Sequence, residues 1–502
     1  MARECDIVYS EHSLLDVIKL GATEADGRHA RGIRHPLSSM LIILLIGFLL
    51  GQNTIRGICR YFSHKEKLEQ LKSFLDLPFG IPSPSCYTRT LAVVDPLPIV
   101  TCYADFLYQL VPHNPEMPQH LCADGKALNG ALNRTLTGRS LYIINIFLAA
   151  YHLFTYQVRV GPKSQEGKVL EEEIYDILYQ DPSIVTADAM ATKKAIVDLI
   201  CKAGSNAVLP VKKNNRNLMN ILLEVCVPLA QENEATDHYV DLNGFSEGDV
   251  PSAVIEDARC AVFDEDNRKE PGADKKRAIE THIFFDKLYQ YPTCEECELP
   301  LDPVNTRLCY VRIGDRWIPM MHVHGRLERR EYELFTDPAL IDAIHENVAM
   351  EGWENVEAFG LVTRYRGESK RDPDTKKEYM QISVTRTPYI MTFRPESVRQ
   401  FAAIVKGHWA IEEGHNCLDD LFDEDHSTTR KGSAPETCAF LRKIAYNTIS
   451  LLEAKSKVNA SSSVDHERRL TETKEKLVQG GIAKIKRLIS HRFRSPFFPK
   501  KA

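Results

Sequence analysis

Two short apolar stretches that each lead into an aspartate decide the fold prediction: HLCAD at residues 120–124 and SIVTAD at residues 183–188. Runs of roughly four to eight apolar or β-branched residues with polar boundaries are typical of buried strands. Neighbouring buried strands bring the residues at their matching ends to one edge of a sheet. The pattern therefore predicts a sheet edge that carries both Asp124 and Asp188.

The segments around these two stretches complete an α/β pattern. Read in order, residues 119–214 predict strand, strand, strand, helix, strand, helix and strand. The five further elements are strands at 140–152 (SLYIINIFLAAYH), 153–160 and 207–211, and helices at 168–180 and 191–202. We therefore expect an α/β core whose first part spans residues 119–214.

Residues 1–118 predict an all-α unit. Their most apolar run, MLIILLIGFLL at residues 40–50, has 11 residues, whereas a helix that spans a membrane needs about 20. A buried core helix is the expected structure. The unit could bind DNA or serve only as a scaffold, and its composition does not decide between the two.

The remaining chain divides into three parts. Residues 215–388 predict a polar, β-rich insertion with strands at 307–311, 358–365 and 380–385, and residues 389–453 predict helices again. The last part, residues 454–502, is a basic tail with 13 Lys or Arg against 4 Asp or Glu. Its charge suits non-specific phosphate binding, and an unstructured tail without a role is the alternative.

Composition excludes several classes of protein. The 502 residues carry a net charge of −6, and 43% hydrophobic with 26% charged residues is typical of globular domains. The acidic balance argues against a chain that coats nucleic acid with its whole surface and leaves local basic patches as the candidates. The 13 irregularly spaced cysteines and the charged N-terminus favour a cytoplasmic protein with reduced thiols and no membrane partner. Nucleotide-driven activity is unsupported because no Walker motif occurs.

The strand-end aspartates and a helical glutamate together suit a two-metal site. Mg²⁺ prefers carboxylate and phosphate oxygens, and two such ions stabilise both the attacking and the leaving oxygen of a phosphoryl displacement. The third carboxylate would be Glu412 in KGHWAIEE (residues 406–413), four residues after His408 and so on the same helix face. Each residue alone has a simpler interpretation: Asp124 or Asp188 as a turn or cap, and Glu412 as a solvated side chain.

Several dispersed motifs resemble the DDE transposases of bacterial insertion sequences, specifically the H-repeat-associated (ISAs-type) group. The similar segments are ADGKAL (123–128), TADAM (186–190) with KKAI (193–196), VLPVKKN (208–214), HGRLERR (324–330), HWAIE (408–412), DED (423–425) and RKGSAPE (430–436). The helical segment 35–96 resembles the N-terminal domain associated with that family. The resemblance covers roughly residues 30–452.

The resemblance implies an RNase H-like catalytic core with metal-dependent DNA cleavage and strand transfer. Asp124, Asp188 and Glu412 would be the catalytic residues and metal ligands, with Mg²⁺ as cofactor and Mn²⁺ as a substitute. Water would hydrolyse the DNA at the element end, and the freed 3′-OH would then attack target DNA. A homodimer on double-stranded DNA, associated with the nucleoid, is expected. The residues assigned to DNA binding are Lys126, Lys193, Lys212, Lys213, His324, Arg326, His408, Arg430 and Lys431.

The chain also departs from the family pattern. Glu413 stands where the family has Asn, the segment up to Phe422 is one residue shorter, and residues 229–315 look longer. These departures keep two alternatives open: an inactive or domesticated DNA-binding protein, and a metal-dependent nuclease without strand transfer. Cys294 and Cys297 form a C-x₂-C pair, for which reduced thiols or a structural zinc site remain the interpretations.

Overall fold

The computed structural model describes residues 9–31, 33–113, 118–131, 141–160, 166–178, 182–231, 237–241, 255–264, 281–285, 307–313, 316–323, 326–371, 378–457 and 466–497. The chain forms two compact units. The first combines Met1–Ser205 with Lys406–Ala502, and the second is Asn206–Val405. Both units mix helices and strands, which confirms the predicted α/β class.

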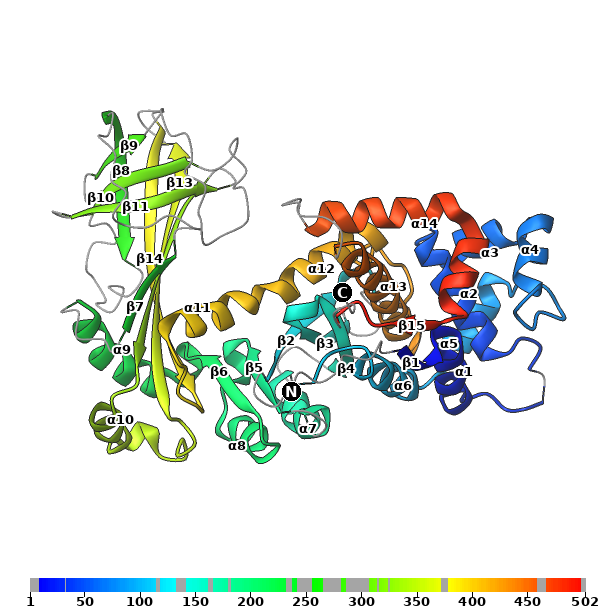
Figure 1. The fold of residues 1–502 in the computed structure, drawn as a ribbon, viewed down its shortest axis with the longest axis horizontal. Coiled ribbons are helices and arrows are strands. Elements are labelled where there is room, and N and C mark those ends of the chain that lie inside the picture. The colour runs from blue at the N-terminus through cyan, green and yellow to red at the C-terminus, as the bar shows by residue number, and fades with distance from the viewer. Residues whose placement is uncertain are drawn as a thin grey trace, which may run out of the picture. The chain divides into compact units, whose positions relative to one another are not determined.

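The first unit begins with a strand and six helices (Figure 1). They are β1 (Tyr9–Ser13), α1 (Leu14–Ala25), α2 (Leu37–Leu49), α3 (Ile55–Phe62), α4 (Lys65–Lys72), α5 (Pro84–Leu91) and α6 (Leu97–Tyr108). Local capping explains where several of them begin: the hydroxyls of Ser13, Thr54 and Ser83 each accept a hydrogen bond from a backbone amide of the following first turn.

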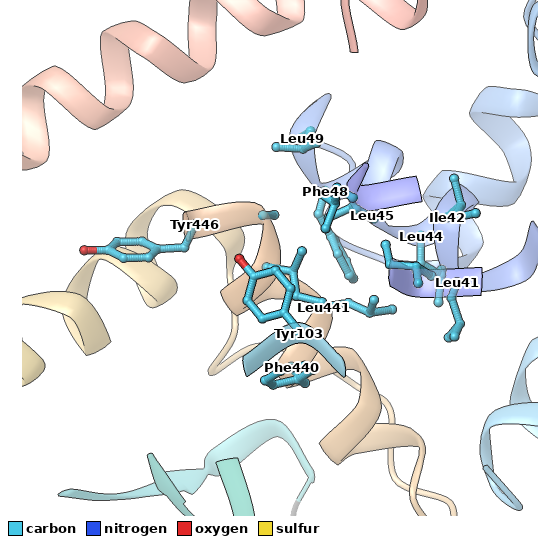
Figure 2. Close-up of a cluster of buried hydrophobic side chains, with 14 of the residues drawn as sticks. Leu41, Ile42, Leu44, Leu45, Phe48, Leu49, Tyr103, Phe440, Leu441 and Tyr446 are labelled. Atoms are coloured by element: carbon cyan, nitrogen blue, oxygen red, sulfur yellow. The ribbon is translucent and has the colours of Figure 1, made fainter. Parts of the chain in front are cut away.

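Helix α2 lies at the centre of the apolar core of the first unit. Nearly all of its side chains are buried, and Figure 2 shows Leu45 and Phe48 in one apolar cluster with Tyr103 of α6 and Phe440 of α13 (Ala434–Lys457). The prediction of a buried core helix at residues 40–50 is thus confirmed. Among the described residues, no helix combines the length and the apolar character that a membrane crossing requires.

Four strands of the first unit form the sheet that carries the two aspartates. In spatial order they are β4 (Leu153–Val160), β3 (Leu141–Leu148), β2 (Gln119–Leu128) and β5 (Ser183–Ala187). Neighbours pair antiparallel except β2 and β5, which are parallel. Helices α7 (Glu166–Leu178) and α8 (Lys194–Lys202) flank β5 in sequence. The predicted order of elements is confirmed up to this point.

Two predicted strands of the first unit have clearly different limits. The strand expected at residues 140–152 ends at Leu148, because a 3₁₀ turn follows at Ala149–Tyr151 and His152 adopts a left-handed conformation with φ of 51°. The strand expected to end before Asp124 instead continues to Leu128 and pairs with β3 over its whole second half. It continues through the charged residue Lys126 because the carboxylates of Asp419 and the buried Glu424 compensate that charge.

The C-terminal part of the first unit is helical and well packed. It comprises α12 (Trp409–Phe422), α13 (Ala434–Lys457) and α14 (His466–Ile489), which kinks at Gly481. The short strand β15 (Arg492–Arg494) then pairs antiparallel with β1. The basic tail is therefore structured over most of its length, with Leu470, Ile485 and Phe493 buried in the core. Charge pattern alone did not predict this helix.

The second unit contains most of the predicted β-rich region. Its elements are β6 (Asn206–Pro210), α9 (Arg216–Gln231), β7 (Asp237–Asp241), β8 (Ile255–Asp264), β9 (Thr281–Phe285), β10 (Arg307–Ile313), β11 (Arg316–Val323), β12 (Arg326–Phe335), α10 (Pro338–His345), β13 (Ala358–Arg371), β14 (Glu378–Met391) and most of α11 (Val398–Gly407). Helices α9 and α10 were not predicted.

The long strands β12, β13 and β14 pair antiparallel and form the centre of the second unit. Phe335, Phe359 and Phe401 are buried against this part of the sheet. Strand β13 extends past the predicted end at residue 365 because it pairs with β14 along its whole length, so its backbone hydrogen bonds continue to Arg371. Charged side chains on this exposed part also pair with each other, and Arg366 lies 2.7 Å from Glu368.

Candidate active site

The pairing of β2 with β5 brings Asp124 and Asp188 together. The two strands run parallel with Ala123 opposite Ala187, so each aspartate is the next residue in register. Strand β5 ends at this point, whereas β2 continues. Both aspartates line one pocket, with Asp188 exposed and the Asp124 side chain 19% exposed. The predicted convergence of the two carboxylates at one sheet edge therefore occurs.

The pocket is narrow because α7 lies close to the turn after β5. Its lining includes Gly167 and Leu170 of α7 together with Met190 and Ala191. A Cβ atom on Gly167 would lie 2.8 Å from the Met190 carbonyl oxygen, which is closer than van der Waals contact. Glycine is therefore required for this approach of α7. The close contact encloses the two aspartates on one side.

Glu412 lies in the first turn of α12 and has an exposed side chain. It is not among the residues that line the pocket of the two aspartates. Within the described part of the chain, no group of three or more His, Cys, Asp and Glu side chains is arranged to hold a metal ion. Glu413, the neighbouring carboxylate, is exposed as well. The structure thus unites the two aspartates but leaves the glutamate apart from them.

Helix α12 contacts β2 through two polar pairs in matched register. His415 Nδ1 lies 3.4 Å from Asp124 Oδ2, and Lys126 Nζ lies 2.7 Å from Asp419 Oδ1. Alternate strand residues face the same side about 6.7 Å apart, and helix residues four apart are separated by about 6 Å along the axis. The spacings Asp124–Lys126 and His415–Asp419 therefore match. Lys126 also donates to the His415 carbonyl oxygen at 3.2 Å.

Asn145 of β3 completes this arrangement from the other side. It is the direct cross-strand partner of Asp124, is fully buried, and places Nδ2 2.8 Å from His415 Nε2. Burial lowers the pKa of His415, an effect that the nearby Asp124 carboxylate opposes. In the neutral ring, Nε2 accepts from Asn145 and Nδ1–H points toward Asp124. The Phe154 ring stacks on the His415 ring, with 5.8 Å between the ring centroids.

Behind these residues lies an ionic cluster formed by the buried Lys126, Glu424 and Lys443 and the half-buried Asp419. Lys126 Nζ is 3.1 Å from Glu424 Oε2, and Lys443 Nζ is 3.9 Å from Glu424 Oε1. Burial alone would lower the pKa of Lys126, but the carboxylates of Glu424 and Asp419 together raise it. Burial lowers the pKa of Lys443 to about 8, and Glu424 partly offsets the effect. The cluster joins β2, α12 and α13.

The predicted DNA-binding residues of the first unit occupy different environments. Lys126 is buried in the ionic cluster, which favours a structural role. His408 is half-buried with Nδ1 3.0 Å from the Thr186 hydroxyl. Lys193 keeps 42% of its side chain exposed next to α7. Arg430 and Lys431 are exposed, and Arg430 donates to the Gly130 carbonyl oxygen at 3.2 Å.

The other predicted DNA-binding residues belong to the second unit. Lys212 and Lys213 are exposed directly after β6. Arg326 opens β12 and lies 2.9 Å from Glu328. His324 lies outside the described residues, as do Cys294 and Cys297, the pair considered for zinc.

Sequence reasoning missed His415, which contacts Asp124, and Asn145, which contacts His415. His415 was treated only as part of a departure from the family pattern, and Asn145 only as part of an apolar strand. One signal was available, because Asn145 is the single amide within the run LYIINIFL at residues 141–148. A second was the pairing of the Asp-x-Lys spacing with the His-x₃-Asp spacing, which match only when a strand faces a helix.

Comparison with known proteins supports the resemblance. The family described as "Transposase DDE domain" matches residues 116–448, well over half of the chain. The chain belongs to this family. The preceding residues 23–107 match the domain described as "DDE_Tnp_1-associated". Both predicted aspartates and Glu412 lie within the matched transposase segment.

Curated relatives of this transposase family member cover most of its length. The "Putative transposase YncI" of Escherichia coli O157:H7 is 22% identical over 442 residues, which are 88% of this chain and 88% of that protein. The "H repeat-associated putative transposase YhhI" of Escherichia coli (strain K12) is 20% identical over 429 residues, 85% of this chain and 88% of that protein. These relatives confirm the H-repeat-associated group.

A solved structure also shows a distant similarity. The cryo-EM structure of the piggyBac transposase synaptic complex with hairpin DNA superposes with a TM-score of 0.35 at 9% identity, covering 96% of this chain and 84% of that one. A TM-score of this size supports no conclusion about the fold of this chain. The family assignment therefore depends on the sequence comparisons alone.

Proposed function

We propose that this chain is a DNA transposase that cleaves the ends of an insertion sequence and joins them to target DNA. The observation that carries the proposal is the shared pocket of Asp124 and Asp188, two carboxylates far apart in sequence at the end of the β2–β5 pairing. Glu412, in the first turn of the adjacent helix, is proposed as the third acid.

The arrangement of strands supports an RNase H-like core for this proposal. Three antiparallel strands, β4, β3 and β2, are followed across the sheet by the parallel strand β5. Asp124 belongs to the first strand in sequence and Asp188 follows the parallel one. Such an order places two carboxylates at one edge, where a scissile phosphate can approach from solvent.

The residues in the pocket fit a divalent metal ion. Carboxylate oxygens are the ligands that Mg²⁺ and Mn²⁺ prefer, and one or two protein carboxylates plus substrate phosphates are a common ligand set. Asp124 and Asp188 would hold the ion, joined by Glu412. When bound, the ion would stabilise negative charge on the oxygens of the reacting phosphate. The chain contributes a fixed Asp124, an accessible Asp188 and a helix tied to the sheet.

Double-stranded DNA is the proposed substrate. Lys193 is half-buried beside Gly167 of the pocket and lies 4.0 Å from Glu171, and we propose that it contacts a phosphate near Asp188. Arg430 and Lys431 offer two more exposed positive charges in the first unit, and Lys212 and Lys213 two in the second, where the half-buried Arg326 is paired with Glu328. Such side chains position the DNA backbone and do not read its sequence. We further propose that the chain acts as a homodimer, because transposition joins two paired ends.

A cleavage and joining assay tests the proposal. Purified protein is incubated with DNA that carries the ends flanking its gene, target plasmid, and Mg²⁺ or Mn²⁺. We expect a nicked end and a joined product, both abolished by Asp188→Ala. Asp420→Ala, an exposed aspartate on α12, is the matched control and should leave both products unchanged. DNA binding without cleavage in either metal would refute the assignment.

One observation favours a second candidate, a DNA-binding protein derived from a transposase that no longer cuts. Glu412 does not line the aspartate pocket, and no three-acid group is present within the described ranges. The same assay separates the candidates. The second candidate predicts that wild type and Asp188→Ala bind DNA equally, seen as protein–DNA bands of equal intensity on a native gel, and that neither cleaves it. Cleavage without a joined product would instead identify a nuclease.

A further inference from the structure

We propose that His415 is a positioning residue that fixes the orientation of the Asp124 carboxylate, and that Asn145 holds His415 in place for this task. The inference rests on the proposed function, since it assigns Asp124 to the reacting site. It adds two residues, one on α12 and one on β3, to a set that so far comprised only acidic and DNA-binding side chains.

The three side chains form a continuous chain of contacts. Asn145 Nδ2 lies 2.8 Å from His415 Nε2, and His415 Nδ1 lies 3.4 Å from Asp124 Oδ2. Hydrogen bonds in active sites are often this long without substrate and shorten when it binds. The Asn145 contact leaves Nδ1 as the protonated nitrogen, so the imidazole presents a donor to the carboxylate. The contact involves one oxygen of Asp124, so the other oxygen is available to bind a ligand.

Burial makes this arrangement selective for one geometry. Asn145 is fully buried and only 8% of His415 is exposed. A buried polar group without a partner is destabilising by about 1–3 kcal/mol, so His415 cannot turn away from both neighbours without cost. The register of Asp124 opposite Asn145 fixes the distance between the two groups that the ring bridges. The carboxylate is thus held from the protein side, while its pocket side faces the site.

Packing alone is the competing explanation for His415. Its ring stacks on Phe154 at an interplanar angle of 18°, and a Cβ on the preceding Gly414 would lie 2.9 Å from the same Phe154 ring. Any flat ring at position 415 would satisfy this packing. Only a side chain with a donor at the place of Nδ1 would satisfy Asp124. The two explanations therefore predict different responses to substitution.

Three variants separate the two explanations. His415→Asn keeps an amide donor near the position of Nδ1, His415→Gln places its amide near the position of Nε2, and His415→Phe keeps only the ring. Mn²⁺ binding to the full-length protein is followed by electron paramagnetic resonance, without DNA. Single-turnover cleavage gives the rate constant and the apparent KM for DNA. Thermal unfolding shows that each variant is folded.

We expect His415→Gln and His415→Phe to bind Mn²⁺ about 10–100-fold more weakly, the usual effect of removing a residue that orients a metal ligand. His415→Asn should stay within about threefold of wild type. The cleavage rate constant at subsaturating metal should fall in parallel, with KM for DNA unchanged. Asn145→Leu, which removes support from Nε2 while keeping His415, should weaken Mn²⁺ binding in the same direction.

Two results would overturn the inference. One is His415→Phe with wild-type Mn²⁺ affinity, and the other is a loss in His415→Asn as large as in His415→Gln. If a variant at position 415 does not fold, the Mn²⁺ affinity of Asn145→Leu decides: an affinity equal to wild type would overturn the inference. The proposed function fails separately: wild type would then show no Mn²⁺ binding that depends on Asp188. Binding that Asp188→Ala abolishes and that His415 variants leave intact would remove only the inference.

Discussion

Two helices of the first unit differ in the contacts that place them. Helix α2 is buried on nearly every side, and its apolar side chains share the cluster of Figure 2 with residues of α6 and α13. Helix α12 also buries apolar residues in this core, but it adds polar contacts with β2, through His415 with Asp124 and through Asp419 with Lys126. The apolar contact is strong but non-directional, whereas the polar contact depends on the distance between particular atoms.

This difference explains how one unit combines stability with a precise site. Apolar packing supplies most of the free energy of folding and tolerates small shifts of a helix if volume is kept. Charged pairs in a buried position contribute little net stability, but they are strongly destabilising when one partner is removed. The β2–α12 contact therefore specifies where α12 lies along the strand. Glu412 is on the first turn of the helix that this contact places.

Substitution of Lys126 should give the largest effect. Lys126→Met leaves Glu424 and Asp419 without their nearest cation, and the loss of one partner from a buried pair lowers the free energy of unfolding by about 3–5 kcal/mol. Urea unfolding without DNA measures this change. The prediction also tests the DNA-binding assignment of Lys126.

If Lys126 mainly contacts phosphate, Lys126→Met would leave the unfolding free energy unchanged and reduce the salt dependence of DNA binding by about one unit of slope. Lys431→Met is the matched control because Lys431 is exposed. It should leave stability unchanged and act only on DNA binding.

In the apolar core, Leu45→Ala should give the second-largest loss of stability. Leu45 is fully buried in α2, and a cavity left by such a truncation costs about 2–5 kcal/mol. The comparison is sharpened by Leu45→Met, which keeps the volume and should cost less than about 1.5 kcal/mol. Urea unfolding of both variants measures the difference. If both variants lost the same free energy of unfolding, the packing of α2 would depend on exact atomic positions as much as the contact of α12 does.

Most of the fold around the aspartates could be predicted from the sequence, since it depends on local pattern. Apolar runs identified α2, β3, β4 and β5, and charge at helical spacing identified α7. The end of β2 was predicted too early, at Asp124, because the apolar pattern stops at this charged residue, and only tertiary contacts show that the charge of Lys126 further along the strand is compensated. Helix α14 was missed because its burial depends on packing against α13 and against α2, which is far away in sequence.

The candidate site divides in the same way. Asp124 and Asp188 were predictable because each follows an apolar stretch that pairs in parallel. His415 and Asn145 were not, because neither occurs in a local pattern, and their roles exist only where β2, β3 and α12 meet. The contacts of Lys126 with Asp419 and Glu424 likewise join residues almost 300 positions apart, which no local rule relates.

The smallest predicted effect concerns Glu436, at the start of α13 between the ionic cluster and the apolar core. Burial raises the pKa of this carboxyl to about 7; Asp95 adds to the increase, while Arg159 and Lys443 oppose it. The unfolded chain has a pKa near 4.3 for glutamate. Folding therefore takes up a proton between about pH 4.3 and pH 7, and this group's contribution to stability falls as pH rises through that window.

Glu436→Gln should remove the destabilisation caused by this buried carboxylate. The free energy of unfolding of the variant should therefore exceed that of wild type by nearly zero at pH 4 and by on the order of 1–3 kcal/mol above pH 7. Urea unfolding across this range measures the gain, and Glu475→Gln, at an exposed position on α14, should show none. If the gain in unfolding free energy did not depend on pH, the charge of Glu436 would not be its cause. The packing of the side chain would then determine the effect, as it does in the apolar core.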